Sequence, residues 1–397
     1  MKIGYLIPEF PGQTHAFFWR EAQAMEEAGA EIHFLSTRRP APQACPHDFR
    51  DQATARTHYV FPPSFGAVAA LFVRPAALIR GLGYVLGLRE TPLSARLKLL
   101  ALLGAAAELN RFCKRTGLDH LHIHSCANAA HLGALNKRFG GPGYSLTLHG
   151  DLPVYGTDHI AKMAPARFVS AVTRPLARDI HALLPDLRAP VIWMGVDCDR
   201  FQPDATRQNR PDAPFTVLTV ARLNRTKGHR YTLQAIADLV GRGHDIQFRI
   251  VGTGPEDSAI RDAIAEFGLE DRVTMLGALD ETGVRDEVQS ADVLALTSFG
   301  EGEAAPVVVM EAMACGCPVV VSRIGGTPDM IEDGTDGYLV PQQDAPAIGA
   351  ALEQLASDPD LRHRMGMAAR QTALETFDFR ANAKRLLGEI QQTTGMA

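Results

Sequence analysis

The sequence is short of cysteine, of positive charge and of long apolar runs, and each shortage excludes a class of protein. Six cysteines are spread over 397 residues without paired spacing, which argues against a disulfide scaffold and favours a reduced, cytoplasmic setting. The formal net charge of -5 argues against a general nucleic-acid binder, so no nucleic-acid partner is expected. No uncharged apolar run reaches the roughly 18 residues that span a bilayer, and the apolar stretch at the N-terminus is too short for a secretory signal.

The length suits two domains, and strand-like runs alternate with helix-like runs in both halves. This alternation predicts an α/β protein with two doubly wound domains, whose parallel sheets are covered on both faces. The expected strands of the first half are 3–7, 31–36, 120–124, 144–148, 168–171 and 191–194. Those of the second half are 215–220, 247–251, 273–276, 293–296, 319–322 and 337–340. The proline-rich segment 195–214 is the expected linker, and ligands are expected at the carboxyl ends of the strands, in a cleft between the domains.

The most informative segment is 299–320, because it places two glutamates around the start of a helix. Glu303 lies in a glycine-rich loop, Pro306 is expected in the first helical turn, and Glu311 about two turns into the helix. Backbone amides between Ala304 and Val308 are then available for a phosphate or for sugar hydroxyls. The alternative is that one glutamate only balances the charge at the start of the helix and the other lies on a solvent-exposed face, since both arrangements have the same composition. Against that alternative, Glu311 lies among small and apolar residues, where an unpaired carboxylate is costly.

Two cations lie at a strand-to-helix junction in the second half. Arg222 and Lys227 follow a strand and precede a helix that begins near Arg230. This arrangement suits a diphosphate, although a solvated basic loop would look the same in isolation. Gly252 and Gly254 follow the next strand, but without a third glycine they predict a tight turn rather than a dinucleotide site.

Histidines gather at the strand ends of the first half. His149 follows a strand and is expected to open into the cleft. His120, His122 and His124 alternate along another strand and therefore face one way, which is also a pattern of zinc sites. A zinc site needs a further ligand, so His124 is assigned to the acceptor pocket instead. The D-x-D at 197–199 lies in the expected linker, and no metal is expected in either place.

Taken together, the motifs resemble those of the retaining glycosyltransferases of family four, the glycosyl transferases group 1, which have the GT-B architecture. The resemblance covers almost the whole chain and is strongest over 216–341. It implies an acceptor-binding Rossmann-like domain over 1–195 and a donor-binding Rossmann-like domain over 196–376. It also implies that a final helix within 377–397 packs back on the first domain.

The resemblance implies a role for each matching residue. Catalysis would rest on His149 near the donor sugar, Glu303 on the sugar hydroxyls, and Arg222 and Lys227 on the leaving diphosphate, while Glu311 holds the ribose. The implied donor-binding residues are Gly12, Arg222, Lys227, Gly252, Gly277, Ala304, Ala305, Pro306, Val307 and Glu311. The implied acceptor-binding residues are Gln13, Thr14, His15, His124 and Asp151.

The expected function is transfer of a sugar, with retention and without a metal, from a nucleotide sugar that is UDP- or GDP-linked. The expected acceptor is membrane-linked, either a lipid-linked glycan of exopolysaccharide synthesis or a diacylglycerol-type lipid. Three alternatives stay open: a glycosidase, a nucleotide-sugar epimerase of the same architecture, and a sugar-nucleotide binding protein without catalysis. The products separate them: a glycosidase would hydrolyse simple glycosides without a nucleotide, an epimerase would release its product without an acceptor, and a binding protein would not consume the donor.

The segment 65–105 mixes large apolar residues with arginines and is opposed by one acidic residue, Glu90. This composition is typical of helices that lie in the headgroup layer of an anionic membrane. A helix pair buried against its own domain, with its arginines in solvent, is the alternative. A peripheral position on the inner face of the cytoplasmic membrane is therefore expected.

Overall fold

The structure is a computed structural model that describes residues 1–12, 15–41, 44–45, 47–204, 213–300 and 303–395. The chain divides into two compact units, which we describe separately. Unit 1 comprises Met1–Trp193 and Arg380–Ala397, and unit 2 comprises Met194–Phe379. Unit 1 is thus built from two stretches of the chain, since the last helix belongs to it.

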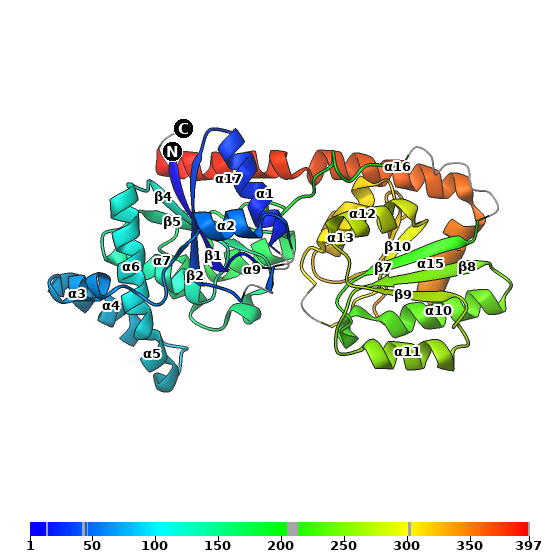
Figure 1. The fold of residues 1–397 in the computed structure, drawn as a ribbon, viewed down its shortest axis with the longest axis horizontal. Helices are drawn as coiled ribbons and strands as arrows, with labels where there is room; N and C mark the ends of the chain where they lie inside the picture. The colour runs from blue at the N-terminus through cyan, green and yellow to red at the C-terminus, as the bar shows by residue number, and fades with distance from the viewer. Residues whose placement is uncertain (13–14, 42–43, 46, 205–212, 301–302, 396–397) are drawn as a thin grey trace. The chain divides into compact units, whose positions relative to one another are not determined.

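Unit 1 contains one six-stranded parallel sheet with the strand order β3-β2-β1-β4-β5-β6. Its strands are β1 (Lys2–Glu9), β2 (Glu31–Arg38), β3 (His58–Tyr59), β4 (His120–Ile123), β5 (Gly143–Leu148) and β6 (Val169–Ala171). Its helices are α1 (Ala16–Glu27), α2 (Arg50–Arg56), α3 (Phe65–Phe72), α4 (Pro75–Leu86), α5 (Leu93–Leu99), α6 (Ala101–Thr116), α7 (Asn128–Arg138), α8 (His159–Met163), α9 (Arg174–Leu183) and α17 (Phe379–Thr394), with the 3₁₀ helix η2 (Leu152–Tyr155). The core lies between the sheet and helices α6 and α7, which pack against each other (Figure 1).

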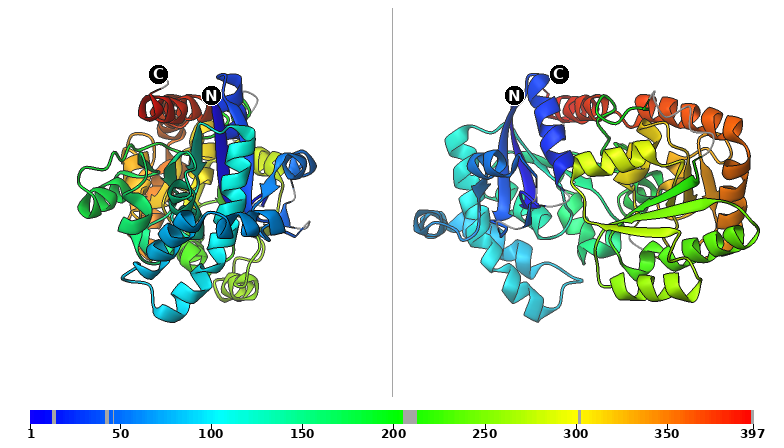
Figure 2. Two further views of the ribbon diagram at one scale, coloured as in Figure 1. Left: turned by 90° about the vertical axis from the view of Figure 1, so that its left-hand side faces the viewer. Right: turned by 45° about the vertical axis from the view of Figure 1, so that its right-hand side comes forward.

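Unit 2 contains a second six-stranded parallel sheet, with the order β12-β11-β10-β7-β8-β9. Its strands are β7 (Phe215–Val220), β8 (Ile246–Val251), β9 (Val273–Gly277), β10 (Val293–Leu296), β11 (Val319–Ser322) and β12 (Tyr338–Val340). Its helices are α10 (His229–Gly241), α11 (Asp257–Glu266), α12 (Glu281–Ser290), α13 (Val307–Ala314), α14 (Thr327–Met330), α15 (Ala345–Ser357) and α16 (Pro359–Thr376), with the 3₁₀ helix η4 (Arg225–Lys227). Helix α10 packs against α11 and α15, whereas α13 packs against α12 and α16, so the sheet is covered on both faces (Figures 1 and 2).

Each sheet has a point where the strand order reverses. In unit 1 the chain builds outward from β1 to β3 and then returns to place β4 on the other side of β1. In unit 2 it builds outward from β7 to β9 and then places β10 on the other side of β7. Ligands of open parallel sheets bind at such switch points, beyond the carboxyl ends of the strands.

The predicted α/β class with two Rossmann-like sheets is confirmed, and two details of the strand prediction are wrong. The segment 191–194 is not a strand, because only Val191 bridges to Ala171. Strand β3 was not expected, since two residues are too short to leave a pattern in the sequence. Among the described residues no single helix is long and apolar enough to cross a membrane. Helices α3 and α4 are long and apolar enough only when they are taken together, and the chain bends by 96° where they meet.

Candidate active site

The switch point of unit 2 brings together two side chains that the sequence singled out. Lys227 ends η4, which follows β7, and Glu303 follows β10. The Lys227 ammonium donates a hydrogen bond to Oε2 of Glu303 and forms an ion pair with it. A cation and a carboxylate therefore meet where β7 and β10 lie side by side.

Glu303 is held by more than this ion pair. The Ser298 hydroxyl donates a hydrogen bond of 2.6 Å to the same oxygen, Oε2, and the Glu303 residue is 8% exposed. The loop after β7 is fixed to the loop after β10, because the amide of Phe299 donates to the carbonyl of Thr226 at 2.8 Å. The carboxylate thus has a defined position, which a hydroxyl-bearing ligand requires of its acceptor.

Gly325, in the loop after β11, supports the backbone of Glu303. It has a φ of +54°, and a Cβ at this position would lie 1.7 Å from the Glu303 carbonyl oxygen. The next amide, that of Gly326, donates to the carbonyl of Ala304 at 2.8 Å. Sequence reasoning missed this support, and the Gly-Gly pair in the loop after a buried strand was the signal that could have found it.

Helix α13 begins one residue later than expected. Pro306 is the residue before the helix, with an extended ψ of 117°, and Val307 is the first helical residue. Glu311 is therefore little more than one turn into the helix, not about two turns, and it is partly exposed. The first amides of α13 have no partner within the helix, as in every α-helix. They follow the buried residues Ala304 and Ala305.

The other donor residues expected from the sequence follow β7, β8 and β9 at the same edge of the sheet. Arg222 is exposed in the loop after β7. The amide of Gly252, after β8, donates to the carbonyl of Gly277 at the end of β9, at 2.7 Å. A Cβ on Gly252 would lie 1.9 Å from the carbonyl oxygen of Ala221, and its φ is +141°. Gly252 therefore permits a close approach of two loops.

The switch point of unit 1 carries the histidines. Nδ1 of His124, directly after β4, lies 3.1 Å from Nε2 of His149, directly after β5, and the two rings stack. On its other side, Nε2 of His124 lies 3.4 Å from Oε1 of Glu21, a buried residue of α1. Glu21 in turn accepts a hydrogen bond of 2.6 Å from the hydroxyl of Tyr5. Sequence reasoning missed Glu21, which looks like any glutamate of an amphipathic helix.

Burial controls the protonation of this cluster. Desolvation lowers the pKa of His149 to about 3 and that of His15 to about 4, and it lowers the pKa of His124 well below its ordinary value. Desolvation raises the pKa of the Glu21 carboxyl to about 7, against a smaller opposite effect of the Tyr5 hydrogen bond. The histidines are therefore neutral at pH 7, and Glu21 is the group that titrates there.

The residues expected to bind the acceptor are only partly described. Gln13 and Thr14 lie outside the described residues. The amide of His15 donates to the carbonyl of Gly12 at 3.1 Å, and the imidazole of His15 stacks on the ring of Phe10. Asp151 precedes η2 in the loop that follows His149.

The histidines do not supply a ready metal site in the described part of unit 1. Possible ligand atoms of Glu21, His122 and His124 lie within 4.8 Å of one another. However, both ring nitrogens of His122 are already bonded, to the hydroxyls of Ser145 and Thr147 at 2.7 and 2.9 Å. Binding a cation would break one of these buried hydrogen bonds. Asp197, in the D-x-D, instead accepts hydrogen bonds from the amides of Asp199 and Arg200.

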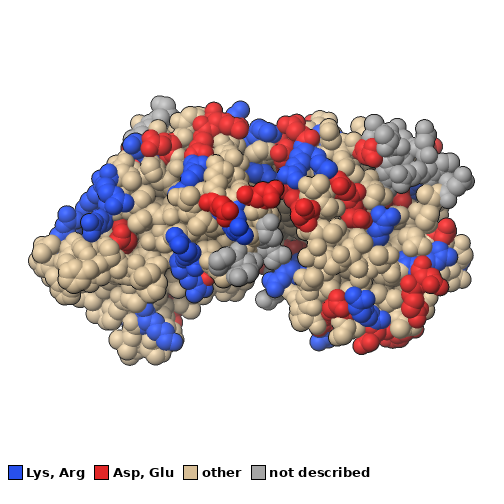
Figure 3. Space-filling model, viewed as in Figure 1, with Lys and Arg blue, Asp and Glu red and all other residues tan. Residues whose placement is uncertain are grey.

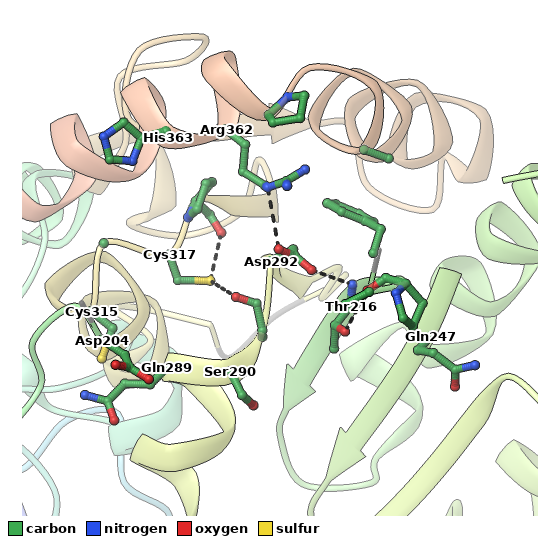
Figure 4. A pocket seen from close by; sticks show the side chains of 18 of the residues that line it. Asp204, Thr216, Gln247, Gln289, Ser290, Asp292, Cys315, Cys317, Arg362 and His363 are labelled. Atoms are coloured by element: carbon green, nitrogen blue, oxygen red, sulfur yellow. Dashed lines mark hydrogen bonds and ion pairs between the residues drawn. The ribbon is translucent and has the colours of Figure 1, made fainter. Parts of the chain in front are cut away.

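A pocket of about 950 Å³ lies at the opposite edge of the sheet of unit 2, around the amino ends of the strands (Figure 4). Asp292 crosses it: its carboxylate accepts from the amide of Thr216 at 2.8 Å and lies 3.5 Å from Nε of Arg362. These contacts join the starts of β7 and β10 to α16. The pocket is therefore away from the edge at which Lys227 and Glu303 meet.

Comparison with known proteins agrees with this geometry. Residues 201–372 match the family described as "Glycosyl transferases group 1". The chain is 28% identical to WcaL of Escherichia coli (strain K12), a glycosyltransferase assigned to colanic acid biosynthesis, over 90% of this chain and 92% of that protein. It is 27% identical to the amylovoran biosynthesis glycosyltransferase AmsK of Erwinia amylovora, over 90% and 91%.

The fold is also that of solved glycosyltransferases with two Rossmann-like domains. The crystal structure of Anabaena Alr3699/HepE in complex with UDP matches with a TM-score of 0.76 at 17% identity, over 99% of this chain and 100% of that one. Residues 201–372 therefore belong to the glycosyl transferases group 1, and the chain is a glycosyltransferase with the GT-B fold.

Proposed function

We propose that the chain is a retaining, metal-independent hexosyltransferase that moves a sugar from a UDP- or GDP-linked donor to a membrane-linked acceptor. The observation that supports this most directly is the meeting of Lys227 and Glu303 at the switch point of unit 2. In this proposal Lys227 and the exposed Arg222 bind the diphosphate, Glu303 binds the sugar hydroxyls, and Glu311 binds the ribose. His149 contacts the donor sugar.

The reaction breaks the bond between the anomeric carbon and the diphosphate oxygen and forms a bond to an acceptor hydroxyl on the same face of the sugar. The acceptor's proton passes to the departing diphosphate. Negative charge grows on the diphosphate as the bond breaks, so the Lys227 and Arg222 cations stabilise the transition state more than the bound donor. Oxygen acceptors at Glu303 hold the sugar hydroxyls while positive charge grows on the ring.

The acceptor is proposed from a surface of unit 1 that we call the α3–α5 surface. Seven large apolar residues on it are exposed: Phe65, Phe72, Val73, Ile79, Leu86, Leu93 and Leu97. Phe65 is 89% exposed, and α5 contains no buried residue. The inner side of the same helices packs normally, since Leu71, Tyr84 and Val85 are buried in the core. Helices α3 and α4 thus bury one side in the core of unit 1 and expose apolar residues on the other.

Basic side chains border this apolar surface. Arg74, Arg89 and Lys98 are exposed, and Figure 3 shows mostly uncharged surface over α3 and α4 with lysine and arginine beside it. Exposed apolar groups next to cations suit an anionic lipid surface, where each cation contributes about 1 kcal/mol. Because WcaL and AmsK are named for the biosynthesis of colanic acid and amylovoran, we propose a lipid-linked glycan of exopolysaccharide synthesis as the acceptor.

The test is a transfer assay with a panel of UDP- and GDP-sugars, a lipid-linked glycan extract, and mass analysis of the products. The expected product carries one added sugar in the donor's anomeric configuration, and the yield is unchanged by EDTA. Loss of activity with EDTA contradicts metal independence, and an inverted product contradicts retention. Sugar added only to diacylglycerol moves the acceptor to a glycerolipid. Conversion of the donor without any acceptor would indicate an epimerase, and hydrolysis of simple glycosides a glycosidase.

A further inference from the structure

A chain of three side chains in unit 1 leads from a buried carboxyl group to His149. Oε1 of Glu21 lies 3.4 Å from Nε2 of His124, and Nδ1 of His124 lies 3.1 Å from Nε2 of His149. The contact between Glu21 and His124 is at ion-pair distance and is not a hydrogen bond, and Nε2 of His124 and Nδ1 of His149 are both buried without a hydrogen-bond partner among the described residues. Glu21 and His124 are both buried, whereas His149 is partly exposed.

The proton on Glu21 fixes the hydrogen atoms along this chain, because a neutral imidazole has one donor and one acceptor nitrogen. When Glu21 is ionised, its negative charge, 3.4 Å from Nε2 of His124, favours a hydrogen atom on that nitrogen, and Nδ1 of His124 accepts from Nε2 of His149. Nδ1 of His149 then carries a lone pair. When Glu21 is protonated, this charge is absent, Nδ1 of His124 donates to Nε2 of His149 instead, and Nδ1 of His149 carries a hydrogen atom. No net charge enters or leaves the two histidines in this exchange.

We propose that Glu21 acts through His124 as a positioning residue that sets whether Nδ1 of His149 accepts or donates a hydrogen bond. The inference rests on the proposed function, in which His149 contacts the donor sugar. A sugar hydroxyl can both donate and accept, so the tautomer of His149 determines how the hydroxyl is oriented. The ionised form of Glu21 presents a lone pair to a hydroxyl, and the protonated form presents an N–H.

The surroundings of the chain allow this exchange near neutral pH. Burial raises the pKa of Glu21 to about 7, and the hydroxyl of Tyr5, on β1, donates to Glu21 and partly opposes that rise. The pKa values of the histidines stay low, so neither imidazole takes up a second proton at pH 7.

The other titratable groups around the chain of Glu21, His124 and His149 are His15 before α1, His122 on β4 and Tyr155 on η2. Phe17 and Phe18 of α1 pack on the rings of the chain.

The first test is spectroscopic and uses the full chain with ¹⁵N-labelled histidine and no donor. Two-bond ¹H–¹⁵N spectra, assigned with a His149→Gln variant, report the tautomer of His149 through its nitrogen shifts. We expect Nδ1 of His149 to change from donor-type to acceptor-type as the pH rises through about 7. In Glu21→Gln, whose amide keeps the shape but does not titrate, we expect this change to be lost.

Tyr5→Phe is the second variant, and it keeps Glu21 titratable. Removing the phenol's hydrogen bond should shift the midpoint of the same change to higher pH, since that bond lowers the pKa of Glu21. A His149 tautomer that does not respond to pH in the parent chain would overturn the proposal. An unchanged transition in Glu21→Gln would also overturn it. A chelator that alters the His149 signals would show that a bound metal ion, rather than a proton, links the residues, and this too would overturn it.

Transfer assays then separate this inference from the proposed function. The parent enzyme should show a change in kcat near the pH of the spectroscopic transition, and Glu21→Gln should lose that dependence. A chain with the spectroscopic transition but no transferase activity refutes the proposed function and leaves the coupling intact. An active transferase whose Glu21→Gln variant keeps the parent's pH profile refutes the coupling.

Discussion

Lys227 and Glu303 are 76 residues apart in the sequence, yet their side chains form an ion pair at the switch point of unit 2. The carboxylate is largely buried, and its Oε2 also accepts a hydrogen bond from Ser298. Removing one partner of a largely buried pair leaves the other without compensation, which is costly. Variants at this position therefore change both the charge and the shape of the site, so each variant needs a matched control.

Lys227→Ala and Arg222→Ala are expected to lower kcat more than donor affinity, because charge on the diphosphate grows in the transition state. The loss of kcat should be about a hundredfold for Lys227→Ala. Steady-state kinetics at saturating donor measure it. Arg225→Ala is the matched control, since Arg225 is exposed in the same 3₁₀ helix and should be near the parent in kcat. Parent-like turnover in Lys227→Ala would contradict the assigned role.

Glu311→Ala is expected to weaken nucleotide binding. Hydrogen bonds to a charged acceptor contribute about 1.5 to 3 kcal/mol, which corresponds to a loss of affinity of roughly ten- to a hundredfold. Calorimetry with UDP and GDP gives the dissociation constants. Glu375→Ala, an exposed change on α16, should bind like the parent. If Glu311→Ala also binds like the parent, the ribose is held elsewhere.

Gly325→Ala is expected to reduce both stability and turnover, because a Cβ would lie 1.7 Å from the Glu303 carbonyl oxygen. Gly334→Ala separates crowding from backbone strain, since Gly334 has a φ of +82° but no atom within 4 Å of the added Cβ. The control should lose only about 1 to 2 kcal/mol of unfolding free energy, from the strained φ alone. We expect a larger loss, with displaced Glu303, in Gly325→Ala. Chemical denaturation and kinetics of both variants check this, and equal losses would refute it.

Acid is expected to destabilise the fold through its buried histidines. Desolvation lowers the pKa of His120 to about 3 and those of His131 and His229 to about 4, from 6.5 in the unfolded chain. The unfolded chain therefore binds more protons below pH 6.5, and stability present above that pH is lost as the pH falls toward 4. Each such histidine costs about 1.4 kcal/mol per pH unit in that window.

Glu21 acts in the opposite direction. Its raised pKa gives a contribution to stability that is present below 4.5 and lost as the pH rises through about 7, so it offsets one histidine in part. Urea denaturation at several pH values measures the slope. His131→Gln should reduce the slope, and the exposed His181→Gln should not. A stability that does not change between pH 6.5 and 4 would contradict these pKa shifts.

The α3–α5 surface is expected to bind anionic vesicles. Flotation with anionic lipid should recover the protein, whereas neutral lipid or high salt should leave it in the soluble fraction. Replacing Arg74, Arg89 and Lys98 by glutamine should weaken binding by about 1 kcal/mol for each cation. Arg96 is left intact, because its guanidinium donates to the carbonyls of Thr91 and Leu86 and so holds the loop between α4 and α5.

A matched triple variant controls for net charge in the flotation experiment. It removes three exposed cations elsewhere, namely Arg178, Arg364 and Lys384. This variant should float like the parent. Equal weakening in both triple variants would indicate a general charge effect, and a parent that stays soluble with every lipid would move the acceptor to a soluble sugar or small molecule.

The sequence predicted the sheet of unit 2 more closely than the residues that support the site. Strands β10 and β11 were predicted at their exact bounds, because fully buried parallel strands are short apolar runs. Gly325 and Glu21 were missed, since each acts on a residue far away in the sequence. Pro306 was placed inside the helix because its fixed φ suits both the first turn and the residue before it, and ψ is not encoded locally.

Helix α17 has a consequence for the order in which unit 1 is assembled. Its Glu389 pairs with Arg188, and Ile390 is fully buried in unit 1, although unit 2 lies between these stretches of the chain. During synthesis, residues 1–193 therefore leave the ribosome before α17 does, because all of unit 2 is made between them. A surface that later lies beneath α17 is open to chaperones and proteases during that interval.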